Sequence, residues 1–143
     1  MIAFTISLQV HHVSRDLHFL TEALATQPAF CMTAGEVVNG SPRRTSVWHA
    51  ALFQGANQKH FDQSLEGLIA FLQQHESTVA EFAGDDAMLE IVFTFTISAA
   101  AAREGDLAHT VNLQPFLLYE LSRRQIGAKV QTIYAQETQQ NAS

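Results

Sequence analysis

The sequence predicts an α/β (α+β) fold, a two-layer sandwich in which three helices cover one face of a four-stranded sheet in the order βαβαβαβ. Two observations lead to this prediction. Segments with the two-residue period of strands alternate along the chain with segments that have the 3.6-residue period of helices. Strands covered on both faces are apolar throughout, whereas the first and third predicted strands each have a polar face. We therefore expect all three helices on one side of the sheet.

Residues 2–10 predict the first strand, because apolar and polar side chains alternate strictly along them. Ser14 is suited to cap a first helix, and Pro28 marks where that helix must have ended. Between these two residues, the side chains that would share the buried face of the helix are Leu17, Leu20 and Leu24.

Residues 46–53 predict the second strand, and a turn over residues 54–57 follows it. The strongest helical pattern covers residues 58–83, where apolar residues recur at helical spacing, and Gly84 is a natural stop. The apolar stripe of this helix consists of Phe61, Leu65, Leu68, Leu72, Val79 and Phe82.

Residues 87–98 have the clearest strand alternation in the chain, and residues 99–113 predict a loop. The third helix is predicted over 113–125, with Pro115 in its first turn and Gly127 after its end. Residues 128–135 predict the fourth strand. We expect a single domain over residues 1–136 and a polar tail over 137–143.

The composition excludes some classes of function. The net charge of −6 disfavours nucleic-acid binding, which needs a basic surface. No apolar run approaches the roughly 20 residues that cross a bilayer, so no membrane span is expected. The single cysteine and the absence of a signal-peptide pattern at the start favour a cytoplasmic protein.

No catalytic, cofactor-binding or metal-binding motif is present, so we expect no enzyme activity, no cofactor and no metal. Cys31 is either a nucleophile or a small apolar side chain. The neighbouring His11 and His12 would point to opposite faces of a strand, which hinders joint chelation. Together with His18 and His49 they are either metal ligands or ordinary solvated side chains.

The stretch from Pro28 to Trp48 has no regular period, and long irregular connections in compact domains are usually either functional or disordered. Its double arginine can bind a carboxylate or phosphate, or lie solvated at a loop tip. Trp48 can anchor a partner or fill the core. With the loop after the third strand, the candidate partner-binding residues are Arg43, Arg44, Trp48, Glu104, Asp106 and His109.

The uncovered face of the predicted sheet is a larger candidate surface. It could dock a protein partner or a second copy of the chain, or it could simply be solvated. Its predicted residues are Thr5, Ser7, Gln9, Glu90, Val92, Thr94 and Thr96.

Several spacings resemble the bacterial domain-of-unknown-function family 4279. The resemblance spans about residues 4–134 and rests on the order of the motifs. These are Leu24 four residues before Pro28, the pair Gly35-Glu36, Trp48 at the head of a strand, and a final helix–Gly127–strand ending at Ile133-Tyr134. The chain departs from the family pattern at residues 29–34 and at His11-His12. The family has no established activity, but some small domains of this kind are encoded beside toxins.

These observations predict a non-enzymatic protein-binding domain. The resemblance to this family permits a more specific form, an immunity protein that neutralises a bacterial toxin domain. The alternative is a homodimeric module that binds a small ligand or acts as a scaffold, with self-association through the open sheet face.

Overall fold

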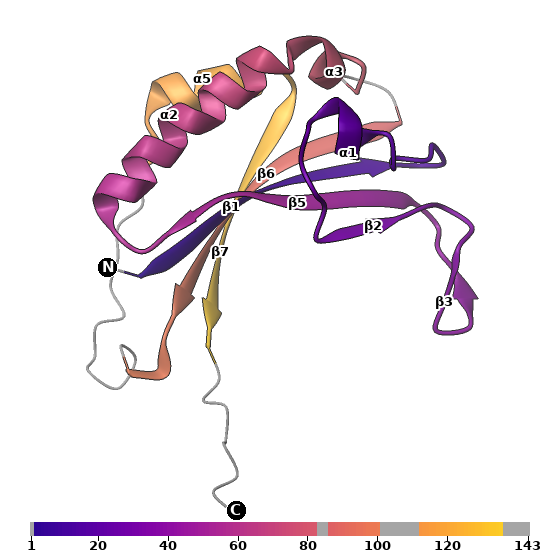
Figure 1. Cartoon of the computed structure of the whole chain (residues 1–143), viewed down its shortest axis with the longest axis horizontal. Helices are drawn as coiled ribbons and strands as arrows, with labels where there is room; N and C mark the ends of the chain where they lie inside the picture. Colours follow the sequence, from indigo (N-terminus) through magenta and orange to yellow (C-terminus); the bar gives the residue numbers. More distant parts are fainter. Residues whose placement is uncertain (1, 83–85, 101–111, 136–143) are drawn as a thin grey trace, which may run out of the picture.

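The computed structural model describes residues 2–82, 86–100 and 112–135. Its centre is a five-stranded mixed sheet in the order β2-β5-β1-β6-β7 (Figure 1). Neighbouring strands are antiparallel except for β6 and β7, which are parallel. The strands are β1 (Ala3–His12), β2 (Phe30–Met32), β5 (Ser46–Gly55), β6 (Ala87–Ile97) and β7 (Ile126–Tyr134).

The described helices lie on one side of this sheet, and the opposite face is uncovered by any described element (Figure 1). A separate hairpin extends from the β2 side of the sheet and consists of β3 (Val37–Val38) and β4 (Ser41–Pro42). The helices are α1 (Leu20–Ala23), α2 (Gln58–Gln74), α3 (Glu76–Ala80) and α5 (Pro115–Ser122).

The predicted four-stranded sheet with three helices in βαβαβαβ order is therefore wrong. The additional strands β2, β3 and β4 all lie between Pro28 and Trp48, the stretch expected to be irregular. Strands of two or three residues are too short to show alternation. The sequence did contain one signal of the hairpin, the pair Asn39-Gly40. Both residues have positive φ angles, 52° and 81°, as a tight hairpin turn requires.

The first helix is much shorter than predicted because side chains compete for its backbone donors. The Nδ1 atom of His12 accepts hydrogen bonds from the N–H groups of Ser14 and Arg15, at 3.0 and 2.8 Å. Asp16 Oδ1 accepts one from the N–H of His18 at 2.9 Å. Such local bonds stabilise turns in place of helix. The predicted buried side chains, Leu17, Leu20 and Leu24, are nevertheless all buried.

The long helix predicted over 58–83 is two helices, α2 and α3, separated at His75. The backbone of His75 has a φ of −109° and a ψ of 26°, which interrupts the helix. At the other end, Asn57 caps α2, because its side chain accepts a hydrogen bond from the N–H of His60 at 2.8 Å.

The helix predicted over 113–125 is α5, with Pro115 in its first turn as expected. It ends before Gly127, because Gln125 takes the left-handed conformation with a φ of 58°. The strand predicted from residue 128 consequently begins two residues earlier, at Ile126.

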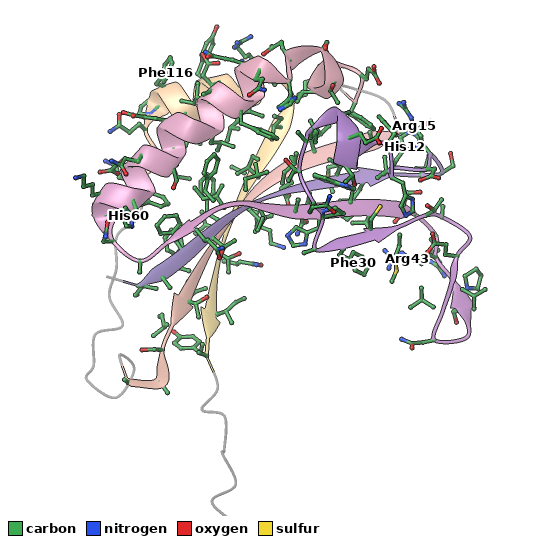
Figure 2. The ribbon with its side chains drawn as sticks, in the orientation of Figure 1. His12, Arg15, Phe30, Arg43, His60 and Phe116 are labelled. Carbon is green, nitrogen blue, oxygen red and sulfur yellow. The ribbon has the colours of Figure 1, made fainter. Side chains whose placement is uncertain are left out.

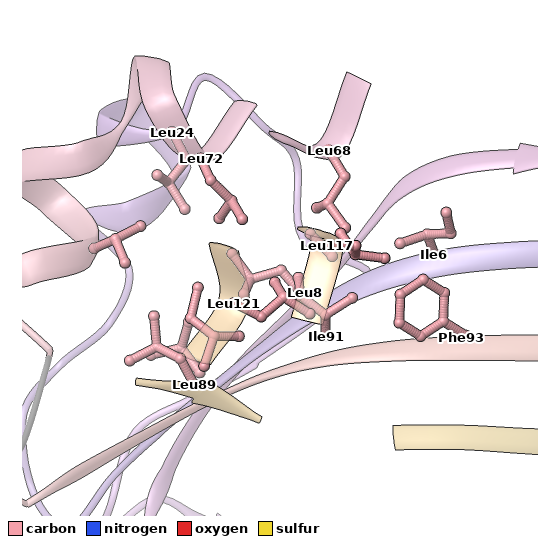
Figure 3. Close-up of a cluster of buried hydrophobic side chains, with 14 of the residues drawn as sticks. Ile6, Leu8, Leu24, Leu68, Leu72, Leu89, Ile91, Phe93, Leu117 and Leu121 are labelled. Atoms are coloured by element: carbon pink, nitrogen blue, oxygen red, sulfur yellow. The ribbon is translucent and has the colours of Figure 1, made fainter. Parts of the chain in front are cut away.

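The core lies between the helices and the inner face of the sheet, where leucines of the helices meet apolar side chains of β1 and β6 (Figure 3). Residues of all four described helices contribute to this one cluster. Its most central members include Ile6, Leu8, Leu68, Leu72, Ile91, Phe93 and Leu121, all essentially inaccessible to solvent.

Candidate functional site

A groove of about 510 Å³ runs between α2 and α5, and we call it the α2–α5 groove. This volume is in the range of pockets that bind small ligands or single side chains of a partner. Its lining residues are Gln58, Asp62, Leu65, Glu66 and Ile69 from α2, with Asn112, Gln114, Phe116 and Leu117 from α5 and the residues before it.

Helical periodicity explains which α2 residues line the groove. Phe61, Leu68 and Leu72 are buried against the sheet. Residues four and eight positions after Gln58 fall on a neighbouring stripe of the helix, and these are Asp62 and Glu66. Half-buried leucine and isoleucine side chains between this stripe and the core form the apolar part of the wall.

The opposite wall is set by the orientation of α5. Leu117 and Leu121 are buried, which directs that face of α5 to the sheet. Phe116, one residue earlier, lies on the side toward α2 and remains 60% exposed (Figure 2). The groove therefore carries an accessible aromatic ring opposite two carboxylates.

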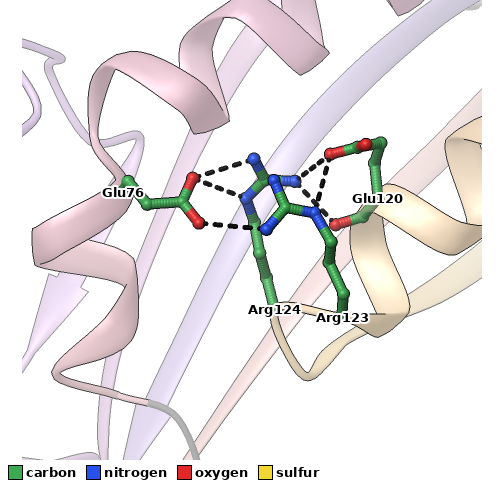
Figure 4. A network of polar contacts seen from close by, with 4 residues as sticks. All are labelled: Glu76, Glu120, Arg123 and Arg124. Carbon is green, nitrogen blue, oxygen red and sulfur yellow. Dashed lines mark hydrogen bonds and ion pairs between the residues drawn. The ribbon is translucent and has the colours of Figure 1, made fainter.

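A cluster of ion pairs fixes α5 against α3 (Figure 4). Arg124 Nη1 donates to Glu120 Oε2 at 2.6 Å and to the Glu120 carbonyl at 2.8 Å. Arg124 Nε donates to Glu76 Oε2 at 2.9 Å, whereas Nη2 lies 2.8 Å from the same oxygen without a well-directed hydrogen bond. Arg123 Nε donates to Glu120 at 3.0 Å. The cluster holds the α5 wall in place from outside the groove.

Both central members of this cluster are held in their charged forms. Hydrogen bonding from Arg124 lowers the pKa of the Glu120 carboxyl, more than burial raises it. Burial disfavours the charged guanidinium of Arg124, but hydrogen bonds from it to Glu120 and Glu76 outweigh burial and raise its pKa. These opposite charges pair with each other within the fold, so we assign the cluster a structural role.

The carboxylates of the groove have a different environment. Asp62 accepts a hydrogen bond from Gln58 Nε2 at 2.9 Å, and neither Asp62 nor Glu66 forms an ion pair with a described residue. Acidic residues at i and i+4 on a helix repel each other. A cation placed between them would relieve this repulsion, so the groove is electrostatically suited to a basic group with an apolar part.

Two of the predicted partner-binding residues, Arg43 and Arg44, lie beside the β3–β4 hairpin and far along the chain from the groove. The Arg43 guanidinium lies 5.6 Å from the centre of the Phe30 ring, and its Nε donates to the Thr45 carbonyl at 3.4 Å (Figure 2). Arg44 is exposed. The structure therefore gives Arg43 intramolecular contacts and leaves Arg44 to solvent.

Trp48 is fully buried, and its Nε1 donates to Thr21 Oγ1 at 3.3 Å. The sequence allowed either a core or a partner-binding role for Trp48, and the structure places its side chain in the core. The other three predicted partner-binding residues, Glu104, Asp106 and His109, lie outside the described residues. The structure therefore describes three of the six predicted positions: Trp48 lies in the core, and Arg43 and Arg44 lie beside the hairpin.

Cys31 and the histidines do not form a reactive site within the described residues. Burial raises the pKa of the Cys31 thiol, and the carboxylates of Asp16 and Glu36 raise it further, which disfavours the reactive thiolate. Within the described ranges, no group of three or more His, Cys, Asp or Glu side chains is arranged to hold a metal ion.

The uncovered sheet face brings two histidines of neighbouring strands close together. Gln9 of β1 pairs with His49 of β5, and His11 lies two residues further along β1 on the same face. Burial lowers the pKa of His49, and a charge on His11 lowers it further. His49 is therefore neutral near pH 7.

Sequence reasoning missed the α2–α5 groove. The pattern Gln58, Asp62, Glu66 at four-residue spacing was a visible signal for a polar stripe on the long helix. This stripe lies near Phe116 only because α2 and α5 pack side by side, and no local sequence pattern reveals that packing.

Comparisons with known proteins return no match: no family model, no curated protein and no solved structure is similar to this chain at the significance required. Among the described helices, none combines the length and apolar character needed to cross a membrane. The geometry of the chain itself must therefore carry any functional proposal.

Proposed function

We propose that this chain is a non-enzymatic protein-binding domain whose α2–α5 groove accepts a basic side chain flanked by apolar ones from a partner protein. The observation that carries the proposal is a single groove that holds the exposed ring of Phe116 and two carboxylates, Asp62 and Glu66, neither of which forms an ion pair with a described residue. An arginine or lysine has an apolar stem and a charged head, so it complements both walls.

The overall charge supports the same partner chemistry. The net charge of −6 attracts basic proteins and speeds their encounter. In its more specific form, the partner is a basic toxin domain, and binding at the groove neutralises it.

The raised pKa of the Cys31 thiol supports a binding role over nucleophilic catalysis.

The proposal is tested by calorimetric titration with a defined probe, the peptide acetyl-Leu-Arg-Phe-Lys-amide. A matched peptide with glutamate in place of arginine and lysine is the control ligand. We expect the basic peptide to bind more tightly, with an affinity that falls as salt is added. Equal affinity of both peptides would contradict the proposal.

Isosteric variants locate the binding to the groove. Asp62→Asn and Glu66→Gln each remove one exposed charge, worth about 0.5–1 kcal/mol, so each should weaken binding roughly two- to fivefold. Glu22→Gln on α1 removes an acidic side chain outside the groove and should leave affinity unchanged. Equal weakening by all three variants would mean that the peptide responds only to net charge.

The toxin-directed form of the proposal has a separate test in cells. Co-expression with a basic toxin domain should protect the cells, and Glu66→Gln should reduce that protection while the level of folded protein stays the same. Protection that survives loss of both groove carboxylates would place the interaction elsewhere.

A further inference from the structure

The two edges of the main sheet are built differently. β7 forms one edge and has nine residues. At the other edge, the three residues of β2 pair only with Val47–His49 of β5, and no described strand pairs with the outer side of β5 beyond His49. No described element pairs with the outer side of β7. A short edge strand offers little for another chain to pair with, but a long one presents a row of unpaired backbone groups.

The hydrogen bonding of β7 shows which groups point outward. The Ala135 N–H donates to the Ile97 carbonyl at 2.9 Å, while Ile97 is the register partner of Tyr134. Backbone groups of alternate residues point to opposite sides of a strand. The odd-numbered residues of β7 therefore bond to β6, and Ala128, Val130 and Thr132 direct their N–H and C=O groups to the free edge.

Apolar side chains surround this edge. Val130, at its centre, is 48% exposed although its register partner Phe93 is buried in the core. Ile133 and Tyr134 are also exposed. Leu118 of α5 lies on the side of that helix opposite Phe116 and is 43% exposed.

The edge lacks most of the features that prevent strand pairing in natural sheets. β7 contains no proline and one charged residue, Lys129. A long edge with apolar neighbours and so little protection is suited to pairing with another strand.

We propose that β7 pairs antiparallel with β7 of a second copy of this chain, with a two-fold axis at Val130. Val130 then faces Val130 of the second copy, and Ala128 faces Thr132. The outward-pointing residues meet each other, which gives roughly six main-chain hydrogen bonds, two for each of three facing pairs. Closed two-fold dimers are the commonest homo-oligomers.

The charge on Lys129 disfavours the neighbouring register centred on that residue. With the axis at Val130, Lys129 faces Gln131 of the second copy, a pairing without repulsion. A register centred on Lys129 would also satisfy the backbone groups, but it places two lysines directly opposite each other, which is destabilising.

The side chains on the uncovered face fit the same register. Ile133 faces Gly127 of the second copy, where no side chain competes for space, since a Cβ atom at Gly127 would have no neighbour closer than 3.8 Å. Phe116, which lines the groove, lies on the side of α5 opposite the edge residue Leu118. Pairing at β7 therefore leaves the α2–α5 groove open, and the dimer is independent of the proposed groove function.

The test measures the oligomeric state of the full chain by sedimentation over a range of concentrations. Val130→Lys and Val130→Glu each place like charges on the axis and should weaken the dimer at least about tenfold. An equimolar mixture of the two variants pairs opposite charges on the axis and should restore the dimer. Val37→Lys changes an exposed valine of the β3–β4 hairpin and is the matched control.

Circular dichroism establishes that each variant is folded before its oligomeric state is measured. A wild-type chain that stays monomeric throughout would overturn the proposal. A dimer that tolerates both single variants, or a mixture that fails to restore it, would also overturn it, because each result places the axis away from Val130.

Discussion

The orientation of α5 underlies both proposed surfaces, and a pair of neighbouring leucines tests it. Leu117 is 3% exposed and lies in the core, whereas Leu118 is 43% exposed and lies on the side of α5 opposite Phe116. Replacing either residue by alanine removes the same three carbon atoms. The two variants therefore differ only in where those atoms lie.

The expected loss of stability follows from burial. Three buried carbons contribute about 2.4 kcal/mol at about 0.8 kcal/mol each. The cavity left beside Leu68 and Leu121 adds about 1 kcal/mol, so Leu117→Ala should cost about 3–4 kcal/mol. Leu118 keeps much of its surface in water and leaves no cavity, so Leu118→Ala should cost about 1 kcal/mol or less.

Urea unfolding with an unchanged slope gives both values. The measurement is made at two protein concentrations about a hundredfold apart, so that any contribution from self-association is separated from the stability of the single chain. Equal losses, or a larger loss for Leu118→Ala, would refute the orientation of α5 and with it the assignment of its two sides.

Three further predictions concern single residues elsewhere. Asn57→Ala should destabilise the chain by about 1 kcal/mol in urea unfolding, because α2 loses its N-terminal cap; an unchanged midpoint would contradict this. Ala25 has a φ of 49°, so Ala25→Gly should raise stability by about 1 kcal/mol in the same assay, and a loss would count against that backbone conformation. Burial lowers the pKa of His49 from its ordinary value of 6.5, so the unfolded chain takes up this proton first and stability should decline as pH falls below that value. His49→Gln should flatten that decline, and an NMR titration midpoint for His49 at or above 6.5 would disprove the prediction.

The long strands β1 and β6 were predictable because their alternation is strong. The sequence places strands over 2–10, 46–53 and 87–98, and the structure has strands at corresponding positions in β1, β5 and β6. In β1 and β6 the apolar side chains of the alternation pack against the helices, so the local pattern reflects the packing of the sheet. β5 lacks a strict alternation and was predicted from its apolar composition.

The remaining elements depended on contacts that no periodicity reveals. The first helix is shortened by the imidazole of His12 and the carboxylate of Asp16, which bond to the backbone just ahead of it. β2 exists because three residues pair with β5, not because of their own alternation.

Strand order also decides the surfaces of interest. β7 is a long edge because it is the last strand in the order and pairs only with β6, and Phe116 shares a groove with Asp62 because α5 packs beside α2. By contrast, the candidate partner-binding residues predicted from the sequence lie in the stretch from Pro28 to Trp48 and in the loop after the third predicted strand. They were chosen for the unusual composition of these segments.

The central claim is that the α2–α5 groove binds a basic, partly apolar segment, and a chemical-shift map tests it most directly. The chain labelled with ¹⁵N is titrated with acetyl-Leu-Arg-Phe-Lys-amide, and the perturbed backbone amides are located on the structure. We expect the perturbations to cluster on α2 from Gln58 to Ile69 and around Phe116, and to be clearly smaller at the same peptide concentration in the Asp62→Asn, Glu66→Gln double variant. Perturbations centred on Gln9 and His49 of the uncovered sheet face, with the groove amides unmoved, would contradict it.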